Sequence, residues 1–294
     1  MTKYSTYKHL QELLKIVKKL IETIVSIIAV LIFSKKFNVR IPKKNSNELV
    51  VLGNGPSLNE LYKNNKDFLI SKDTIATNDF ARSDLFKIIK PNFYTIADPL
   101  LFNDKVADEI KKRSVAIFQN INEADWAISL YVPFKYKKNI EQKISNKNIT
   151  FFYFNHTPCS GFEIIVNYLF DKKLGMPYLK NILIAALILG IYLRYKNIYL
   201  WGVDHDWMKY MVLNKDNILC LKSHHFYHED KQEIWYKENS TPWNVSEALN
   251  SMSQMFNSYK VIYAYAIKKE ISILNQTQNS MIDAFPFKTI KNYE

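Results

Sequence analysis

Short apolar runs alternate with helix-like segments along most of the chain. The predicted strands are 48–52, 73–77, 91–96, 114–118, 150–154, 199–203, 261–265 and 271–274. The predicted helices are 103–113 and those that start at Phe162 and Asn181. Strands that alternate with helices form a mostly parallel sheet with helices on both faces. We therefore predict a single α/β nucleotide-binding domain.

Residues 1–44 combine helical apolar spacing with an excess of basic residues. The basic residues are Lys3, Lys8, Lys15, Lys18, Lys19, Lys35, Lys36, Arg40, Lys43 and Lys44, against Glu12 and Glu22. The apolar stretch Leu20–Phe33 is shorter than the roughly 20 residues that span a bilayer. We predict a basic amphipathic helix that lies on an anionic membrane surface. A spanning helix, or a helix packed on the following domain or on a partner chain, is the alternative.

The first predicted strand ends in the turn Gly53-Asn54-Gly55-Pro56-Ser57, which holds two of the six glycines of the chain. Glycine lets a ligand approach the main chain, and proline suits the first turn of a helix. Free N–H groups at a helix start bind anions. We predict that Gly53, Asn54, Gly55 and Ser57 form a nucleotide loop, with an ordinary tight turn as the alternative. The sequence is neither GxGxxG nor a Walker A loop.

Other polar and small residues follow the predicted strands or precede a helix. They are Asn78, Asp79, Asp98, Ser160, Gly161, Gly202 and Asp204. Ligands of parallel sheets bind outside the carboxyl ends of the strands, so these residues are candidates for one site. Ser160 and Gly161 have an alternative role as a plain helix cap.

Residues 204–245 are rich in aromatic residues and histidine, and we predict a lid over that edge of the sheet. Four of the six histidines fall here, at His205, His224, His225 and His228. A histidine that titrates near neutrality suits a general base that removes a hydroxyl proton. Metal ligation is the competing interpretation, either by these histidines or by Asp98, Asp204 and Asp206 holding Mg²⁺.

Composition limits the classes of partner that we expect the chain to bind. The chain is 48% hydrophobic and 14% aromatic, which is typical of a globular protein, and its net charge of +12 favours anionic partners. We find no nucleic-acid motif and expect no nucleic-acid binding. Cys159 and Cys220 are the two cysteines, which fits a reducing compartment and provides no zinc frame.

Taken together, these segments over residues 48–286 resemble bacterial sialyltransferases of glycosyltransferase family 42 and the related motility accessory, pterin pyrophosphokinase-like proteins of surface-glycan clusters. The segments that carry the resemblance are Leu52–Leu58, Thr77–Phe80, Ala97–Pro99, Ser160-Gly161, Tyr199–Asp204, Ser223–His228 and Asn279–Pro286. Their order and spacing carry the resemblance, because each segment alone is short.

The resemblance implies a metal-independent, inverting glycosyltransferase of a GT-A-like variant fold, with no cofactor beyond a CMP-activated acidic sugar as donor. It implies that His228, or else His225, takes the acceptor proton. The implied donor-binding residues are Gly53, Asn54, Gly55, Ser57, Asn78, Asp98, Ser160, Gly161, Gly202, Asp204, Tyr210 and Tyr227. The chain departs from the family at Asp98, where an asparagine is expected, at Asp206, where a tyrosine is expected, and at Thr157, where an arginine is expected.

We therefore predict a membrane-associating helix over residues 1–44 and a glycosyltransferase domain over residues 45–294. The acceptor would be a glycan or a lipid-linked glycan at the cytoplasmic face of the bacterial inner membrane, and a homo-oligomer is possible. Two alternatives belong to other classes, namely a Mg²⁺-dependent nucleotide phosphotransferase and a non-catalytic membrane-bound scaffold.

Overall fold

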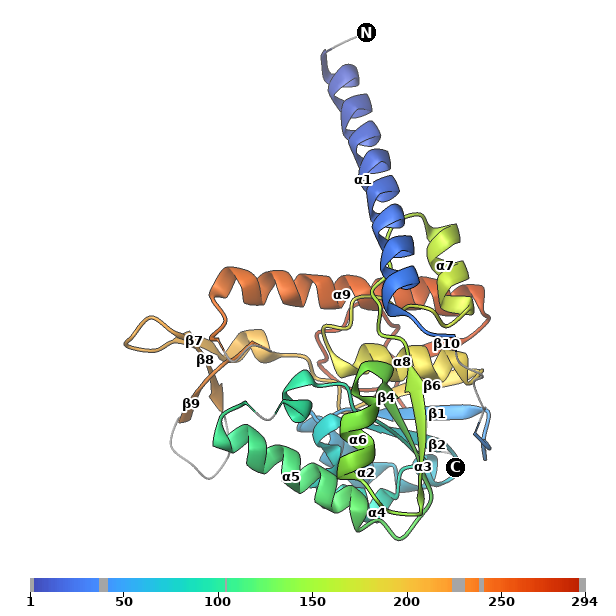
Figure 1. Cartoon of the computed structure of the whole chain (residues 1–294), viewed down its shortest axis with the longest axis vertical. Helices are drawn as coiled ribbons and strands as arrows, with labels where there is room; N and C mark the ends of the chain where they lie inside the picture. Colours follow the sequence, from blue (N-terminus) through green and yellow to red (C-terminus); the bar gives the residue numbers. More distant parts are fainter. Residues whose placement is uncertain (1–2, 37–41, 104, 224–230, 238–240, 291–294) are drawn as a thin grey trace.

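The computed structural model describes residues 3–36, 42–103, 105–223, 231–237 and 241–290, and it centres on a seven-stranded sheet of order β10-β6-β1-β2-β3-β4-β5 (Figure 1). The strands are β1 (Glu48–Leu52), β2 (Asp73–Thr77), β3 (Phe93–Thr95), β4 (Ile128–Pro133), β5 (Ile149–Phe154), β6 (Asn197–Trp201) and β10 (Ser272–Asn275). All pairings of neighbouring strands in this sheet are parallel. The predicted fold class, a mostly parallel α/β sheet, is confirmed.

Helices cover both faces of the sheet. One layer contains α2 (Ser57–Asn64), α3 (Lys66–Ile70), α4 (Leu85–Ile89), α5 (Asp108–Asn122) and α6 (Lys137–Lys143). The other contains α7 (Glu163–Asp171), α8 (Ile182–Tyr192) and α9 (Val245–Lys268). Short 3-10 helices are η1 (Asn78–Arg82), η2 (Pro99–Phe102), η3 (Phe134–Tyr136) and η4 (Trp207–Tyr210).

Side-chain alternation along β1 divides the core into two parts. Leu49 and Val51 belong to the cluster under α8 and α9, whereas Val50 and Leu52 belong to the cluster under α2–α6. Successive residues of a strand point to opposite faces, so a strand buried on both sides is apolar throughout. This explains why β1 has no polar position after Glu48.

Helix α8 is buried on every side, from Leu183 to Ile191. It packs against the sheet at Gly190, where a Cβ atom would lie 2.9 Å from Cδ1 of Ile198 and 3.0 Å from Cδ2 of Leu49. A helix that is hydrophobic all round is a core element.

The chain order across the sheet reverses at β1. Strands β2 to β5 follow on one side of β1, and β6 and β10 lie on the other. In open parallel sheets the crevice at such a reversal, outside the carboxyl ends of the strands, is where ligands bind. The loops after β1 and β6 therefore define the place to search for a site.

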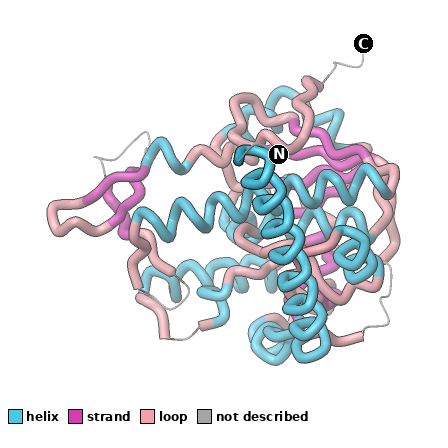
Figure 2. The backbone as a smooth tube through the Cα atoms, turned by 90° about the horizontal axis from the view of Figure 1, so that it is seen from above, coloured by secondary structure: helices cyan, strands magenta, loops and turns pink. Residues whose placement is uncertain are grey.

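The predicted lid contains a separate antiparallel sheet of β7 (Met211–Leu213), β8 (Leu219–Ser223) and β9 (Lys231–Ile234). Figure 2 shows these strands apart from the main sheet, on one side of the molecule. The sequence of this region has little periodicity and does not predict strands there.

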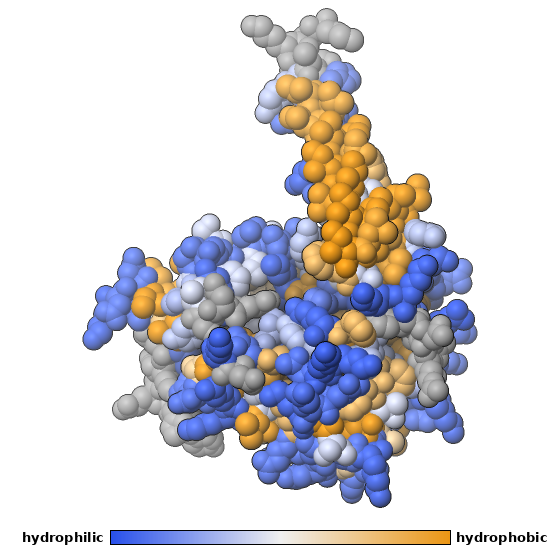
Figure 3. Space-filling view, viewed as in Figure 1, coloured by the Kyte–Doolittle hydropathy of each residue, from blue (hydrophilic) through white to orange (hydrophobic). Residues whose placement is uncertain are grey.

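Helix α1 (Lys3–Phe33) projects from the domain, and only its C-terminal part is packed against it (Figures 1 and 3). Thr23, Ser26 and Val30 are buried, and they lie on one face of the helix at spacings of three and four residues. Within the described part of the chain, no helix is both long and apolar enough to cross a membrane.

Two predicted strands are wrong. Residues 114–118 lie inside α5 and residues 261–265 lie inside α9. In α5 the buried residues Ser114, Ile117, Phe118 and Ile121 recur at helical spacing. A short apolar run fits either a strand or the inner face of a helix, and tertiary packing selects between them. Strand β4 was not predicted.

Candidate functional site

The loops after β1 and β6 are joined by their backbones. The N–H of Gly53 donates to the carbonyl of Trp201 at 2.8 Å, and the N–H of Gly55 donates to the carbonyl of Gly202 at 2.9 Å. A Cβ on Gly53 would lie 2.2 Å from the Gly202 oxygen, and one on Gly55 would lie 1.8 Å from Oδ2 of Asp204. Both glycines are therefore required by close packing at the topological reversal.

Asp204 closes this junction through its side chain. Ser57 Oγ donates a hydrogen bond to Asp204 Oδ2 at 2.8 Å. Burial raises the pKa of the Asp204 carboxyl, the Ser57 hydrogen bond lowers it, and the nearby Asp206 raises it further, with a net increase. The hydroxyl and the carboxylate predicted as separate ligand contacts thus form one pair.

The segment Asn279–Pro286, the last of those that carry the resemblance, contacts the same junction. Ser280 Oγ donates to the carbonyl of Val203 at 2.6 Å, and the N–H of Met281 donates to the carbonyl of Asp204 at 2.9 Å. Segments more than seventy residues apart in the chain therefore meet beside β6.

Asn54 and Asn78 continue the site toward β2 and β3. Asn54 is exposed, and its Nδ2 donates to the carbonyl of Thr77 at 3.2 Å. Asn78 has a positive φ of 38°, a conformation that asparagine tolerates better than most residues. Its Oδ1 accepts from the N–H of Ala97 at 3.1 Å, which ties the end of β2 to the segment after β3.

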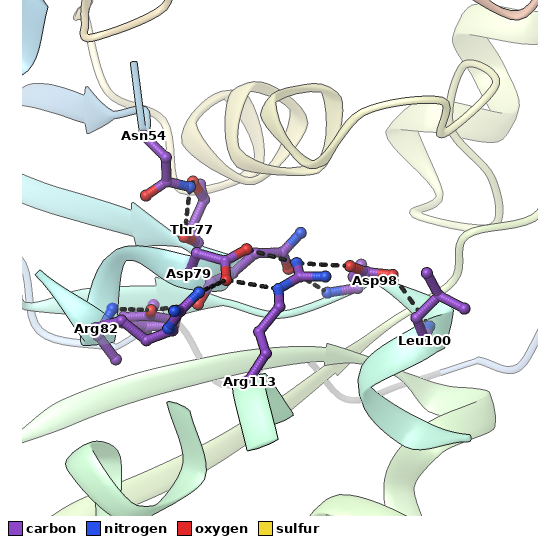
Figure 4. Close-up of polar contacts among 11 residues, drawn as sticks. Asn54, Thr77, Asp79, Arg82, Asp98, Leu100 and Arg113 are labelled. Atoms are coloured by element: carbon purple, nitrogen blue, oxygen red, sulfur yellow. Dashed lines mark hydrogen bonds and ion pairs between the residues drawn. The ribbon is translucent and has the colours of Figure 1, made fainter. Parts of the chain in front are cut away.

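An ion-pair network follows Asn78 along the edge (Figure 4). Arg113 on α5 donates from Nε to Asp79 Oδ1 at 2.6 Å and from Nη2 to Asp98 Oδ2 at 2.8 Å. Arg82 approaches Asp79 at 3.3 Å, and Asp98 Oδ1 accepts from the N–H of Leu100 at 3.0 Å. Burial would lower the pKa of the Arg113 guanidinium, but the two carboxylates raise it above its usual value.

Arg113 was missed in the sequence because it lies in the middle of a helix, far from any strand end. One signal was available. An aspartate at position 98, where the resemblance implies an asparagine, adds a buried negative charge that needs a cationic partner. Arg113 is that partner, and Asp98 is correspondingly 18% exposed at its side chain.

A cleft of about 1320 Å³ opens beside this network. Asn78, Asp98 and Arg113 line one part of it, and side chains from residues 207–243 and from the first half of α9 line the other. The aromatic residues on this second side are Trp207, Trp235, Tyr236 and Trp243. Such a mixture of aromatic faces, cations and polar strand ends suits an anionic ligand that also has flat or sugar-like surfaces.

Ser160 and Gly161 make their described contacts with α1. The N–H of Ser160 donates to Ser26 Oγ at 2.9 Å, and the N–H of Phe162 donates to Thr23 Oγ1 at 2.8 Å. Gly161 has a φ of 121°, and a Cβ there would clash with Thr23. The backbone donors at Ser160 and Phe162, beside the predicted anion contact, are thus satisfied by the N-terminal helix in this structure.

The structure describes some of the candidate residues in the predicted lid and not others. His205 is buried, its Nε2 lies 2.7 Å from the hydroxyl of Tyr259, and burial lowers the pKa of its imidazole to about 3. It is therefore a core residue rather than a base. Tyr210 ends η4 with its hydroxyl 3.4 Å from Asp206 Oδ2. His224, His225, Tyr227 and His228 lie outside the described residues, so the predicted base stays a prediction.

The carboxylates considered for Mg²⁺ have protein partners. Asp98 is paired with Arg113, Asp204 accepts from Ser57, and Asp206 lies near Lys209 and Tyr210. Among the residues that the structure describes, no group of three or more histidine, cysteine or acidic side chains has the arrangement of a metal site. A cation at Asp98 would have to displace Arg113.

Searches found no matching family model and no matching curated protein. Among solved structures, the chain is similar to a MAf glycosyltransferase from Magnetospirillum magneticum AMB-1, with 11% identity and a TM-score of 0.47. That match covers 88% of this chain and 37% of the other, so the chain spans little more than a third of that protein.

It is also similar to an α-2,3/8-sialyltransferase CstII variant, with 16% identity, a TM-score of 0.40 and coverage of 83% and 87% of the two chains. A further match is the sialyltransferase CST-II in complex with a trisaccharide acceptor and CMP, with 15% identity, a TM-score of 0.36 and coverage of 81% and 84%.

Proposed function

We propose that this chain is a glycosyltransferase that moves an acidic keto-sugar, sialic acid or a similar sugar, from a CMP-activated donor to a glycan acceptor. The proposed setting is the assembly of bacterial surface polysaccharide at the cytoplasmic face of the inner membrane. The motif order in the sequence and the contacts at the sheet edge support this proposal.

The observation that carries the proposal is a continuous series of contacts between the motif segments. It runs from Ser280 to Val203 and Asp204, on to Ser57 and Gly55, then from Asn54 through Thr77 to Asn78, and finally to Ala97, which precedes Asp98 in the chain. A parallel sheet brings the turns after its strands to one edge, and direct polar contacts among them at the reversal of strand order are what a nucleotide-sugar site there requires.

In the proposed reaction, the imidazole of His228, or else of His225, removes the proton from the acceptor hydroxyl. The acceptor oxygen then forms a bond to the anomeric carbon from the face opposite the leaving group. The bond from that carbon to the phosphate oxygen breaks, and its electron pair leaves with CMP, which inverts the configuration.

The growing negative charge on CMP needs hydrogen-bond donors or cations. Tyr210 and Tyr227 are the proposed donors to the leaving phosphate. Arg113 neutralises Asp98, so the aspartate at this position need not repel an anionic donor sugar. Asn54 and Asn78 would hold the nucleoside.

The first experiment is a thermal-shift comparison of CMP, CDP, UDP, GDP and ATP. A ligand at 100 times its dissociation constant stabilises the native state by about 2.7 kcal/mol. At roughly 2–4 °C per kcal/mol for a chain of this size, CMP should raise the midpoint by several degrees. Preference for another nucleotide would exclude the CMP donor, and no shift with any of them would favour the scaffold.

A matched pair of variants tests whether CMP binds at the loop after β1. Asn54→Ala should weaken CMP binding, measured by calorimetry, because it removes an exposed amide beside Thr77 and Asn78. Asn59→Ala, an exposed asparagine on α2, should bind CMP as the wild type does. Equal affinities in the two variants would remove Asn54 from the site.

The second candidate is the Mg²⁺-dependent phosphotransferase, favoured by the carboxylate at position 98. It needs Asp98 and Asp204 as free ligands, and the two functions differ in their response to a chelator. Activity of the proposed transferase should survive EDTA, and loss of sugar transfer on chelation would favour the alternative.

A further inference from the structure

An apolar surface at the base of α1 is built from two helices that are distant in sequence. On α1 the exposed apolar residues of its last turns are Ile24, Val25, Ile27, Ile28, Leu31, Ile32 and Phe33. On α7 they are Ile164, Ile165 and Tyr168, of which Ile164 is 82% exposed. Figure 3 shows the apolar surface of α1 continuing onto the neighbouring helix. We call these residues together the α1–α7 surface.

Both helices are fixed to the domain. Thr23 and Ser26 of α1 hold the backbone of residues 160–162, which leads directly into α7. In α7, Val166, Leu169 and Phe170 are buried in the core. The exposed residues of the two helices therefore move as one body with the sheet.

Ion pairs with two lysines at the end of α9 neutralise the acidic side chains at the two ends of α7. Glu163 lies 2.6 Å from Nζ of Lys268, and Asp171 lies 2.5 Å from Nζ of Lys269. The hydrogen bond from Lys268 lowers the pKa of Glu163, so the pair stays ionised at neutral pH. The charges around the surface are then mainly basic, from Lys15, Lys18, Lys19, Lys35 and Lys36, with Glu22 paired to Lys18.

These features point to one occupant. A contiguous apolar area of this kind, rimmed by basic residues, fits the interface of an anionic bilayer, which accepts apolar side chains and attracts cations. A second copy of the chain fits less well, because it would bring the same lysines together. The apolar residues of α1 also cover a wider arc than the narrow seam of a coiled coil.

We propose that the α1–α7 surface docks on an anionic membrane, with Ile164 and Tyr168 of α7 inserting beside α1. This extends the membrane location in the proposed function with a second, rigid contact. Because both helices are fixed to the domain, contact of both with the membrane sets the orientation of the domain. Because α9 contacts α7 at Lys268 and lines the cleft at Met255, the orientation of the cleft is set as well.

The test is flotation of the full chain with phosphatidylcholine vesicles that do or do not contain phosphatidylglycerol. Ile164→Asp should lower the partition coefficient onto anionic vesicles by about tenfold, since it removes a large apolar side chain from the interface and adds a negative charge. Ile164→Leu should bind as the wild type does. The matched control is Ile70→Asp on α3, where the isoleucine is 80% exposed and belongs to the layer on the other face of the sheet.

Each outcome has one meaning. If Ile164→Asp and Ile70→Asp bind equally well, α7 does not dock and the proposal fails, while α1 can still be the anchor. If the wild type does not float with anionic vesicles, the membrane location itself fails. If light scattering shows a dimer that Ile164→Asp dissociates, the surface joins two copies and the proposal is overturned. Unchanged thermal midpoints of the variants would show that the fold is kept.

Discussion

Gly53 and Gly55 are needed for a different reason from the one that their sequence suggests. The pattern GNGPS indicates a loop with free N–H groups for a ligand. In the structure the N–H groups of both glycines bond to the β6 side of the junction, and neither glycine has a positive φ. The absence of a Cβ is what matters, because it lets two backbones approach where the sheet order reverses.

This packing predicts which of two glycine-to-alanine variants unfolds more easily. Gly53→Ala places a Cβ 2.2 Å from the backbone oxygen of Gly202, whereas Gly55→Ala places one 2.7 Å from the same oxygen and closer still to the Asp204 side chain, which can rotate away. Both variants are overpacked, at a cost of about 1–3 kcal/mol, and Gly53→Ala should lie at the upper end. Urea unfolding measures this, with Asn59→Ala as an exposed control. The reverse order would show that the Ser57–Asp204 pair matters more than the backbone contact.

Asp98 and Arg113 show which site residues can be predicted from their own position in the sequence and which cannot. The strand-end position of Asp98 marked it as a site candidate, and it does line the cleft. Its partner is on a helix of another segment, fifteen residues later in the chain. The aspartate indicates that a cationic partner is needed, but local sequence patterns do not say which residue it is, because the helix register that aims Arg113 at the edge is set by burial of Ile117 and Phe118.

At the scale of elements, α1 is packed on the domain, which is one of the interpretations of its sequence, and its membrane association stays a prediction. Its buried face carries hydroxyl groups that satisfy the backbone of residues 160–162, and the hydroxyl of Ser34, directly after the helix, lies 2.8 Å from the hydroxyl of Thr157. The helix is thus packed on the domain, and its remaining faces stay exposed. Removing residues 1–44 would also remove buried Val30, so substitutions test α1 better than truncation.

The hydroxyl contacts give a prediction for α1. Thr23→Val and Ser26→Ala each leave a backbone N–H without its acceptor, which costs about 1–3 kcal/mol of unfolding free energy. Ile24→Thr, an exposed position on another face of the same helix, should change stability by less than about 0.5 kcal/mol. Denaturant unfolding checks all three. Equal stability of Thr23→Val and Ile24→Thr would mean that α1 is only loosely attached.

The errors in the secondary structure have one cause. Residues 114–118 and 261–265 are apolar and rich in β-branched or aromatic residues, which favours strands locally. Both segments belong to longer helices, of fifteen and twenty-four residues, whose buried positions recur every three or four residues. A segment of five residues is too short to show that longer period.

At the scale of the whole molecule, two histidines make folding sensitive to acid. Burial lowers the pKa of His205 to about 3, and burial together with the charge of Lys135 lowers that of His156 to about 4. In the unfolded chain a histidine titrates near 6.5. As the pH falls from about 6.5 toward these values, the unfolded chain binds protons that the native state does not, so the native state loses stability.

Each histidine contributes about 1.4 kcal/mol of lost stability per pH unit over that range. His205→Asn should reduce this slope between pH 4 and pH 6 by about that amount, and asparagine suits the positive φ of 54° at this position. Near neutral pH its stability will be lower because the smaller side chain leaves a cavity, and the difference from the wild type should shrink as the pH falls. His9→Asn, exposed on α1, is the control. An unchanged slope for His205→Asn would mean that the imidazole is protonated in the native state.

The sequence by itself determined the α/β class, the apolar strands β1, β2 and β5, the buried helix α8 and the edge on which polar strand ends collect. These features are local, since the period of apolar residues and the residues that end each run specify them. Only the tertiary structure decided that Arg113 completes the edge at Asp98, that α1 holds residues 160–162, and that α7 extends its apolar surface. Those contacts join segments far apart in the chain, and their geometry depends on how the helix layers pack on the sheet.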